Sequence, residues 1–343
     1  MLPRGRTLRQ RGRRFSLALA IMASDLHVVL GAHGSAGSAL VRALSQRGAR
    51  VRAVSRRSVD PDGRDGTVEW VEGSASADDD RGRVYGGAGV VYLAAQPLYT
   101  RWAQDFPDLV EGVLAGAASV GARLVHVDNA YMYGRVDGEL TEALPIHPQS
   151  KKGRIRAQIA DRLMSANARG DVAVTIGRGS DFFGPNVGGS TAGDALFADV
   201  IDGKTPHWIG ALDVPHSLSY IDDVARALIT LGASERAYGE VWHLPTAPAP
   251  TGREFLTMAC TAAGRPVQVG VHGRLAMTVA GWFSALISEV KQELYQFEEP
   301  WVLDAAKFQR VFGPFDPTPM DDAIRCTVAW YRKAWTDQVS DSA

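Results

Sequence analysis

The chain has 343 residues, of which 45% are hydrophobic and 22% charged, and its formal net charge is −1. These values are close to those of average globular proteins, so they exclude wholesale disorder and a fibrous chain. The length predicts one large α/β domain or two interleaved ones.

The charge is distributed unevenly. Residues 1–21 contain six arginines and no acidic residue, and the remaining 31 basic residues face 38 acidic ones. An acidic body is a poor surface for nonspecific nucleic-acid binding, so we expect no nucleic-acid partner.

The basic start has two interpretations. With the apolar run 15–23 it resembles a signal peptide, but that run is short and leads directly into a predicted strand at 27–30. We therefore favour a disordered tail over 1–25, or a start at Met22. No other stretch reaches the ~18 apolar residues of a membrane span. Cys260 and Cys326 have no metal-like spacing, so we expect a cytoplasmic protein without membrane segment or metal.

Short apolar runs alternate with helical patterns along the first two-thirds of the chain. This alternation predicts βαβ units in a Rossmann-type, doubly wound parallel sheet. We expect an NADP-binding domain over 26–183 and a smaller substrate or lid domain over 184–343, from which residues about 215–245 return to the core. The predicted strands are 27–30, 50–54, 68–71, 90–93, 124–127 and 172–176, and the predicted helices include 39–46, 108–119 and 156–167.

A glycine-rich loop follows the first predicted strand and opens a helix. The spacing Gly31, Gly34, Gly37 permits a tight turn, close backbone approach to a pyrophosphate, and close helix–strand packing. The free N–H groups at the helix start attract phosphate. We predict a dinucleotide site here, formed by Gly31, His33, Gly34, Ser35, Ala36 and Gly37.

The second predicted strand ends in arginines. An NAD-binding site usually has an acidic residue there, whereas this chain has Arg56 and Arg57. Because guanidinium groups bind a 2′-phosphate well, these residues favour NADPH/NADP+ as the cofactor.

Five motifs in order resemble those of the extended short-chain dehydrogenase/reductase superfamily, which includes NAD(P)-dependent epimerases and dehydratases. They are 31–37, 91–95, 125–134, 177–185 and 219–225. The resemblance implies that Leu93, Ala94, Ala95 and Val127 lie along the cofactor and that Gly179 and Ser180 hold it near the nicotinamide.

The active-site motif of that superfamily is altered. The resemblance implies a serine or threonine at Asn129, a tyrosine at Lys152 and a lysine at Arg156. Lysine and arginine cannot replace a phenol as a proton shuttle without a large pKa shift. Asn129, Lys152, Arg156 and the nearby Tyr131 are therefore the candidate catalytic residues.

Three interpretations remain open. In the first, another residue supplies the proton, such as Tyr131 or Tyr133, although a tyrosine at position 133 is more often a packing residue of that strand. In the second, the protein is a non-catalytic NADPH-binding sensor. In the third, a phenol of the substrate polarises its own ketone, with Asn129 hydrogen-bonded to the oxyanion.

Apolar residues at helical spacing over 275–290 form either a core helix or a lid over a flat substrate. The candidate substrate residues are Gln96, Asp181, Phe182, Phe183, Trp282, Phe283 and Leu286. We found no convincing cation cluster for a diphosphate beyond Arg178 and Arg253.

The pattern of lost residues is similar to that of ketoreductases of aromatic-polyketide pathways, especially those that reduce angucyclinones. We predict an NADPH-dependent oxidoreductase that reduces an aromatic polyketide ketone in antibiotic biosynthesis. The enzymatic alternative is a nucleotide-sugar epimerase or dehydratase. The sequence leaves the oligomeric state open.

Overall fold

The computed structural model describes residues 25–57, 68–273 and 285–341. Its centre is a seven-stranded sheet in the order β10-β6-β5-β4-β1-β2-β3, with every neighbouring pair parallel. This Rossmann-like order confirms the predicted fold class. The strands are β1 (Leu26–Leu30), β2 (Arg50–Ser55), β3 (Val68–Glu72), β4 (Ala88–Leu93), β5 (Arg123–Asp128), β6 (Val174–Arg178) and β10 (Val241–His243).

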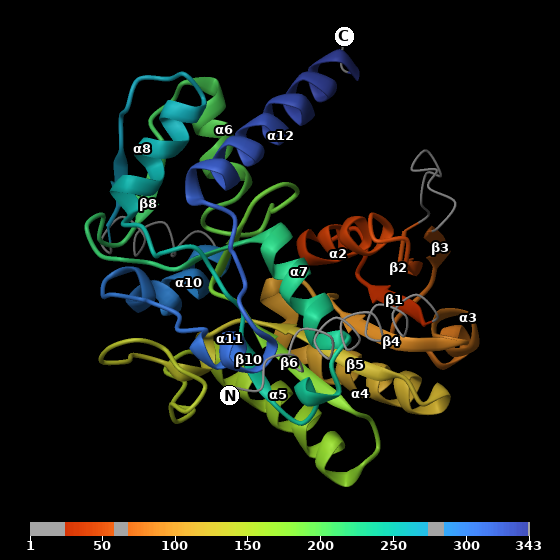
Figure 1. The fold of residues 1–343 in the computed structure, drawn as a ribbon. Coiled ribbons are helices and arrows are strands. Elements are labelled where there is room, and N and C mark those ends of the chain that lie inside the picture. The colour runs from red at the N-terminus through yellow and green to blue at the C-terminus, as the bar shows by residue number, and fades with distance from the viewer. Residues whose placement is uncertain (1–24, 58–67, 274–284, 342–343) are drawn as a thin grey trace, which may run out of the picture.

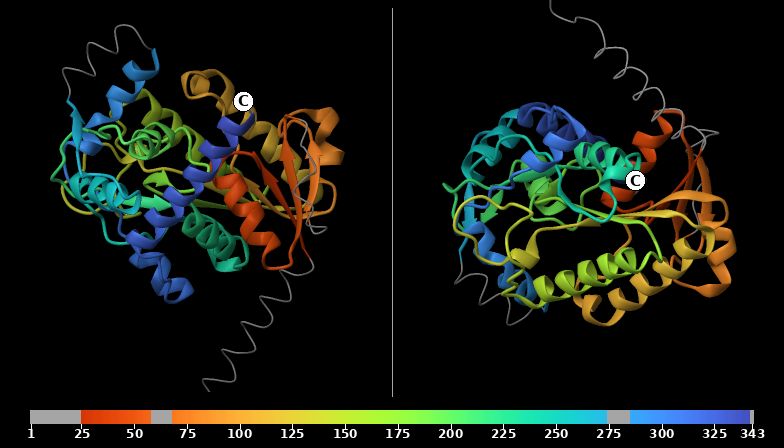
Figure 2. Two further views of the ribbon diagram at one scale, coloured as in Figure 1. Left: turned by 90° about the horizontal axis from the view of Figure 1, so that it is seen from above. Right: turned by 60° about the horizontal axis from the view of Figure 1, so that its bottom comes forward.

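Helices cover both faces of this sheet (Figures 1 and 2). One face packs against α2 (Ser35–Ser45) and α7 (Ile221–Gly232), and the other against α3 (Arg81–Tyr85), α4 (Trp102–Val120) and α5 (Lys151–Arg169). The central strands are therefore apolar on both sides, as parallel strands in such a fold must be.

The position of α5 is fixed at both ends. The Ser150 side chain accepts a hydrogen bond from the Gly153 backbone N–H at 2.8 Å, which caps the first turn. Gly170 ends the helix with a φ of 77°, a left-handed value that suits glycine. Lys152 and Arg156 lie in the first two turns of this helix, and both are buried.

A second cluster of elements packs beside the sheet, with α6, α8 and α12 drawn together in Figure 1. Its core contains Phe183, Phe197, Phe255 and Tyr331. The proposed division into two domains stays a prediction. The elements of this part are β7 (Asp181–Phe183), α6 (Asp194–Asp202), β8 (His207–Ile209), β9 (Leu218–Tyr220), α8 (Gly252–Ala262), β11 (Gly270–His272), α10 (Ala285–Val290), α11 (Ala306–Phe312) and α12 (Met320–Asp341).

Short 3-10 helices connect several of these elements: η1 (Asp78–Asp80), η2 (Tyr99–Arg101), η3 (Tyr131–Tyr133), η4 (Glu235–Ala237) and η5 (Lys291–Phe297). The predicted helices 108–119 and 156–167 begin too late, because α4 and α5 start near residues 102 and 151. Periodicity locates the middle of a helix better than its ends.

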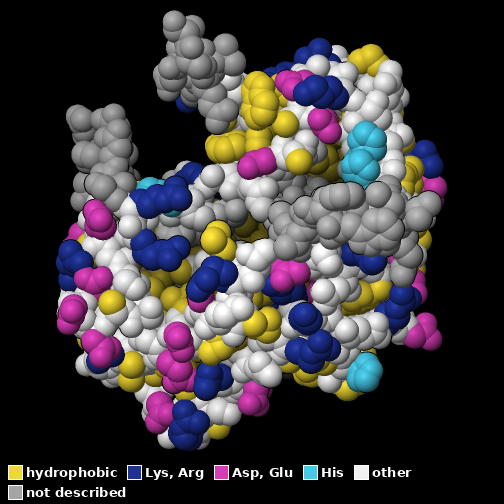
Figure 3. Space-filling view, turned by 180° about the vertical axis from the view of Figure 1, so that it is seen from behind, with side chains coloured by type: hydrophobic (Ala, Val, Ile, Leu, Met, Phe, Trp, Pro, Cys, Tyr) yellow, Lys and Arg dark blue, Asp and Glu magenta, His cyan; other side chains and the backbone are white. Residues whose placement is uncertain are grey.

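In the described part of the chain, no helix is long and apolar enough to cross a membrane. Among the same residues, no group of three or more His, Cys, Asp or Glu side chains is placed to hold a metal ion. On the face seen in Figure 3, basic and acidic side chains are interspersed. The predictions for the basic tail up to residue 24 lie outside the described residues.

Candidate functional site

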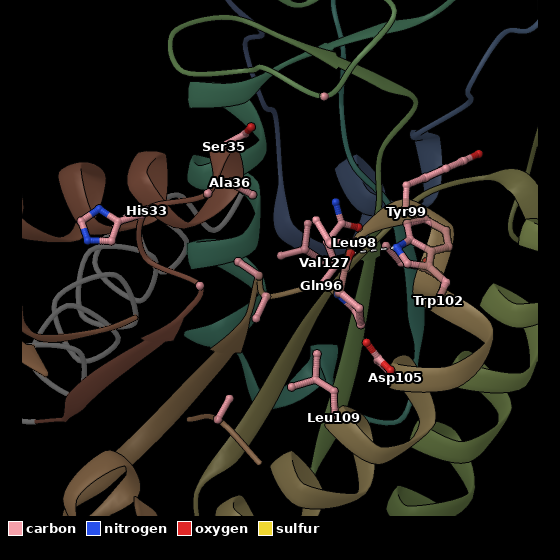
Figure 4. A pocket seen from close by; sticks show the side chains of 18 of the residues that line it. His33, Ser35, Ala36, Gln96, Leu98, Tyr99, Trp102, Asp105, Leu109 and Val127 are labelled. Atoms are coloured by element: carbon pink, nitrogen blue, oxygen red, sulfur yellow. Dashed lines mark hydrogen bonds between the residues drawn. The ribbon is translucent and has the colours of Figure 1, made fainter. Parts of the chain in front are cut away.

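A cavity of about 1110 Å³ runs along the carboxyl ends of the sheet strands (Figure 4). Sheets of this order bind ligands at that edge. The lining residues follow the strands in turn: Gly31 after β1, Arg56 after β2, Gly73 after β3, Ala94 after β4, Asn129 after β5 and Ser180 after β6.

The glycine loop closes one side of this cavity. Gly31 has a φ of 81°, and a Cβ atom built on it would lie 2.7 Å from the Cα atom of Ala95. A Cβ on Gly37 would overlap the carbonyl oxygen of Gly31. Only glycine fits at these two positions, where the backbone of the loop packs directly against the end of β4 and the start of α2.

The start of α2 completes the cradle. No side chain caps this end, and Ser35 and Ala36 line the cavity there (Figure 4). The N–H groups of a first helical turn have no acceptor within the helix. The Asn186 amide donates to the His33 carbonyl oxygen at 3.1 Å and to the Ser38 hydroxyl at 3.0 Å, which steadies the loop. These residues fit a dinucleotide, with its phosphates at the helix N-terminus.

The exposed side chains of Arg56 and Arg57 line the same cavity. Neither forms a salt bridge with a carboxylate in the described part of the chain. Residues 74–76 also line the cavity, although they were not among the predicted site residues. They follow the end of β3, and because sheets of this order bind ligands at the carboxyl ends of their strands, that rule could have predicted them. Next to Arg56, the Asp80 carboxylate accepts from the Ser74 N–H at 2.6 Å and also binds Arg83.

The other end of the cavity combines polar and aromatic groups. Asn129, Tyr131 and Arg156 line it, together with the wall formed by Gln96, Leu98, Tyr99 and Trp102 (Figure 4). The Arg156 guanidinium donates to the Gln96 side-chain oxygen at 2.8 Å and lies over the Trp102 ring, 4.2 Å from its centroid.

Buried charged side chains behind the cavity wall hold Arg156 in place. Asp128 faces two guanidinium groups, with Arg156 Nη1 at 3.4 Å from one carboxylate oxygen and Arg178 Nε at 3.2 Å from the other. Arg178 also donates to the Tyr133 hydroxyl at 2.8 Å, and that hydroxyl lies 2.7 Å from His243 Nε2. Arg178 is therefore a buried structural cation and does not line the cavity.

Arg253 is also unsuited to bind a diphosphate as a free cation, because Asp213 binds it at 2.7 Å.

Lys152, which the resemblance aligns with the superfamily's tyrosine, does not line the cavity. Its ammonium lies 2.9 Å from the Glu289 carboxylate, donates to the Tyr99 carbonyl oxygen and sits 4.2 Å from the Tyr99 ring centroid. These contacts join α5, η2 and α10.

Two groups near Tyr131 were missed by sequence reasoning. His216 Nε2 lies 2.8 Å from the carboxylate of the cavity residue Asp181, a pair that no sequence spacing reveals. Glu293 in η5 is buried, and this burial raises the pKa of its carboxyl to about 7. Burial likewise raises the pKa of the Tyr131 phenol.

Most of the predicted site residues line the cavity, but their roles stay predictions. Phe182 lines it, whereas Phe183 is fully buried in the core of the second cluster. Leu286 belongs to α10, and Trp282 and Phe283 lie outside the described residues. The lining residues among the predictions are Gly31, His33, Gly34, Ser35, Ala36, Arg56, Arg57, Ala94, Ala95, Gln96, Val127, Asn129, Tyr131, Arg156, Ser180, Asp181 and Phe182, while Gly37, Leu93, Lys152 and Gly179 lie behind the surface.

Several solved structures share this fold. Epimerase Mth375 from Methanothermobacter thermautotrophicus has a TM-score of 0.76 and 16% identity, covering 95% of this chain and 97% of that one. The dTDP-glucose 4,6-dehydratase DesIV from Streptomyces venezuelae has a TM-score of 0.74 and 21% identity, covering 90% and 98%. The UDP-glucuronic acid 4-epimerase from Bacillus cereus, solved with NAD, has a TM-score of 0.72 and 16% identity, covering 90% and 99%.

No curated protein matches the chain in sequence. A family model does match, over residues 27–243. The match includes the glycine loop, the cavity strands and the altered active-site segment. The chain therefore belongs to the NAD-dependent epimerase/dehydratase family, whose members use a nicotinamide dinucleotide.

Proposed function

We propose that this protein is an oxidoreductase that uses a nicotinamide dinucleotide, supplying or accepting hydride, to act on a small molecule bound beside Gln96, Asn129 and Tyr131. The observation that carries the proposal is one continuous cavity that joins the glycine cradle to this polar and aromatic end. Its volume exceeds the usual range for a single small ligand, which suits a dinucleotide together with a substrate.

Nucleotide sugars are the first substrate class to test. The family match supports them, and the similar solved structures are an epimerase, a dTDP-glucose dehydratase and a UDP-glucuronic acid epimerase. The missing phenol on α5 argues against the usual chemistry of that class, so a different group must move the proton.

An aromatic polyketide ketone is the second class. It is supported by the apolar wall of Leu98, Tyr99 and Trp102 beside the site. None of the similar structures described above is a polyketide ketoreductase, so this prediction rests on the cavity wall and the altered motif. Polarisation by a phenol of the substrate belongs to the same hypothesis.

We further propose a preference for NADPH over NADH. Arg56 and Arg57 line the cavity where β2 ends, and their charge suits a 2′-phosphate. Binding titrations with both dinucleotides test this preference directly, without a substrate.

The decisive experiment compares both substrate classes. Purified protein is incubated with NAD+ or NADP+ and UDP-glucose, UDP-glucuronic acid or dTDP-glucose, and sugar products are separated chromatographically. In parallel, oxidation of NADPH and NADH is followed with quinones and aryl ketones. Conversion in either arm supports an oxidoreductase and identifies its class. Dinucleotide binding without any conversion would favour a sensor, and lack of binding would contradict the proposal.

A further inference from the structure

The cavity residue Asp181 forms a pair with a buried histidine. His216 is 1% exposed, and its Nε2 atom lies 2.8 Å from one carboxylate oxygen of Asp181. The side chain of Asp181 is itself 10% exposed and reaches the cavity from the start of β7. A buried imidazole thus connects to the ligand space through one carboxyl group.

The hydrogen bond of the other ring nitrogen determines how many protons this pair holds. His216 Nδ1 lies 3.1 Å from the Gln296 carbonyl oxygen, which can only accept a hydrogen bond. Nδ1 must therefore carry a hydrogen. In a neutral imidazole, Nε2 is then an acceptor, and an ionised carboxylate 2.8 Å away would place two lone pairs against each other.

Two arrangements satisfy this geometry. In one, His216 is an imidazolium and donates from both nitrogens. In the other, His216 is neutral and accepts a hydrogen bond from a protonated Asp181. Both arrangements place one proton between Nε2 and the carboxyl oxygen, so the pair holds a proton beyond that of a neutral imidazole and a carboxylate.

His243 provides a comparison within the same protein. Its Nδ1 also lies 3.1 Å from a carbonyl oxygen, that of Asp304, but its Nε2 faces the Tyr133 hydroxyl at 2.7 Å. A hydroxyl can donate to Nε2, and burial lowers the pKa of His243. His243 is thus satisfied as a neutral ring, whereas His216 needs the additional proton.

Neighbouring groups hold both members of the pair in place. The second carboxyl oxygen of Asp181 is within 3.5 Å of the Thr191 hydroxyl. The His216 ring stacks on Phe297 with a centroid distance of 4.4 Å, which fixes its orientation.

We propose that the Asp181–His216 pair is the proton source that takes the place of the missing phenol. This inference rests on the proposed function and specifies its acid. The carbonyl carbon gains hydride from the bound dinucleotide, and the carbon–oxygen π electrons move to the oxygen. Asp181 delivers the shared proton to that oxygen, and the pair later takes up a proton from the solution. Substrate oxidation runs the same transfer in reverse.

The proton on the pair is measured first, in the protein alone. Nitrogen-15 NMR of the histidine rings and carbon-13 NMR of the Asp carboxyl groups at pH 7 report where it lies. We expect either a protonated Nε2 on His216 or a neutral Asp181 carboxyl, and in Asp181→Asn an unprotonated Nε2 that accepts from the amide. An unprotonated Nε2 beside an ionised Asp181 in the unmodified protein would overturn the proposal.

The transfer is measured with NADPH and the carbonyl compound that the unmodified protein reduces fastest in a panel of quinones, aryl ketones and 4-keto nucleotide sugars. Asp181→Asn is expected to lower kcat about 100-fold or more, with NADPH affinity unchanged. Asp202→Asn, a surface carboxylate in α6 paired with Lys204, is the matched control and should keep full activity.

The Glu293→Gln variant shows whether Asp181 or Glu293 supplies the proton. A large loss of kcat in this variant with normal activity in Asp181→Asn would identify Glu293 as the acid and overturn the proposal. If the unmodified protein reduces no compound in the panel, the proposed reduction fails and the transfer fails with it. The NMR result then still decides separately whether the pair holds the proton.

Discussion

Asp128 and Arg156 face each other across 3.4 Å, with 1% and 6% of their side chains exposed, at the base of the cavity. The same carboxylate also holds Arg178. One acidic group therefore balances two buried guanidinium groups, and one of these, Arg156, contacts Gln96 in the cavity wall.

The first prediction concerns this shared carboxylate. Asp128→Asn leaves two buried cations without a counter-charge, which should lower the free energy of unfolding by about 3–5 kcal/mol. Urea unfolding followed by fluorescence measures the loss. Asp171→Asn breaks only the surface pair with Arg169 and should change stability little. Equal stability of Asp128→Asn and the unmodified protein would refute the conclusion that the Asp128 carboxylate balances two buried guanidinium groups.

The second prediction concerns dinucleotide preference. Replacing both Arg56 and Arg57 with alanine should weaken NADPH binding about 10–100-fold, because charge-assisted hydrogen bonds to the 2′-phosphate are lost. NADH binding should stay within a factor of two or so of its original value. Arg50→Ala, at the opposite end of β2, is the matched control. An equal loss of affinity for both dinucleotides would mean that these arginines do not recognise the 2′-phosphate.

The third prediction tests the glycine loop. A Cβ atom on Gly37 would overlap the Gly31 carbonyl, so Gly37→Ala should destabilise the fold by about 1–3 kcal/mol and impair dinucleotide binding. Gly82→Ala in α3 meets no atom within 4 Å and should be neutral or slightly stabilising. Thermal unfolding and fluorescence titration with NADPH report the two effects. Unimpaired binding by Gly37→Ala would show that the loop does not need this close approach.

The fourth prediction uses pH. Burial raises the pKa of Glu293 to about 7 from its usual 4.5, so the folded protein binds more protons than the unfolded chain between these values. Its contribution to stability is complete below about pH 4.5, falls as the pH rises toward 7, and is then lost.

Glu293→Gln removes this titration while keeping a neutral, similarly shaped side chain. Relative to the unmodified protein, the variant should therefore gain up to about 3 kcal/mol in free energy of unfolding between pH 5 and pH 8. Chemical denaturation at both pH values measures the difference. A difference that does not change with pH would show that Glu293 titrates normally.

The fifth prediction concerns Lys152. Since its ammonium is occupied by Glu289 and the Tyr99 carbonyl, Lys152→Met should lower kcat less than tenfold, well below the ~10²–10⁴ contributed by a true acid–base group. Steady-state kinetics with the compound that the unmodified protein reduces fastest in the panel described above provide the test. A loss beyond 100-fold without a change in thermal stability would make Lys152 a catalytic residue.

The sequence by itself determined the parallel sheet, the glycine cradle and the altered active-site segment. These features depend on short-range patterns: apolar runs that form buried strands, glycines at fixed spacing, and residue types within one helix turn. Arg56 could be placed at the cavity because it directly follows a strand whose carboxyl end faces the ligand edge.

Only the tertiary structure decided which side chains meet. Asp181 and His216 are separated by 35 positions. Lys152 pairs with Glu289, which lies in a helix far along the chain. Their contacts depend on how loops and helix ends pack, and local sequence patterns do not encode those distances. The tertiary structure therefore showed that Lys152 does not line the cavity, and it brought together the Asp181 carboxyl and the His216 imidazole on which the proposed proton source rests.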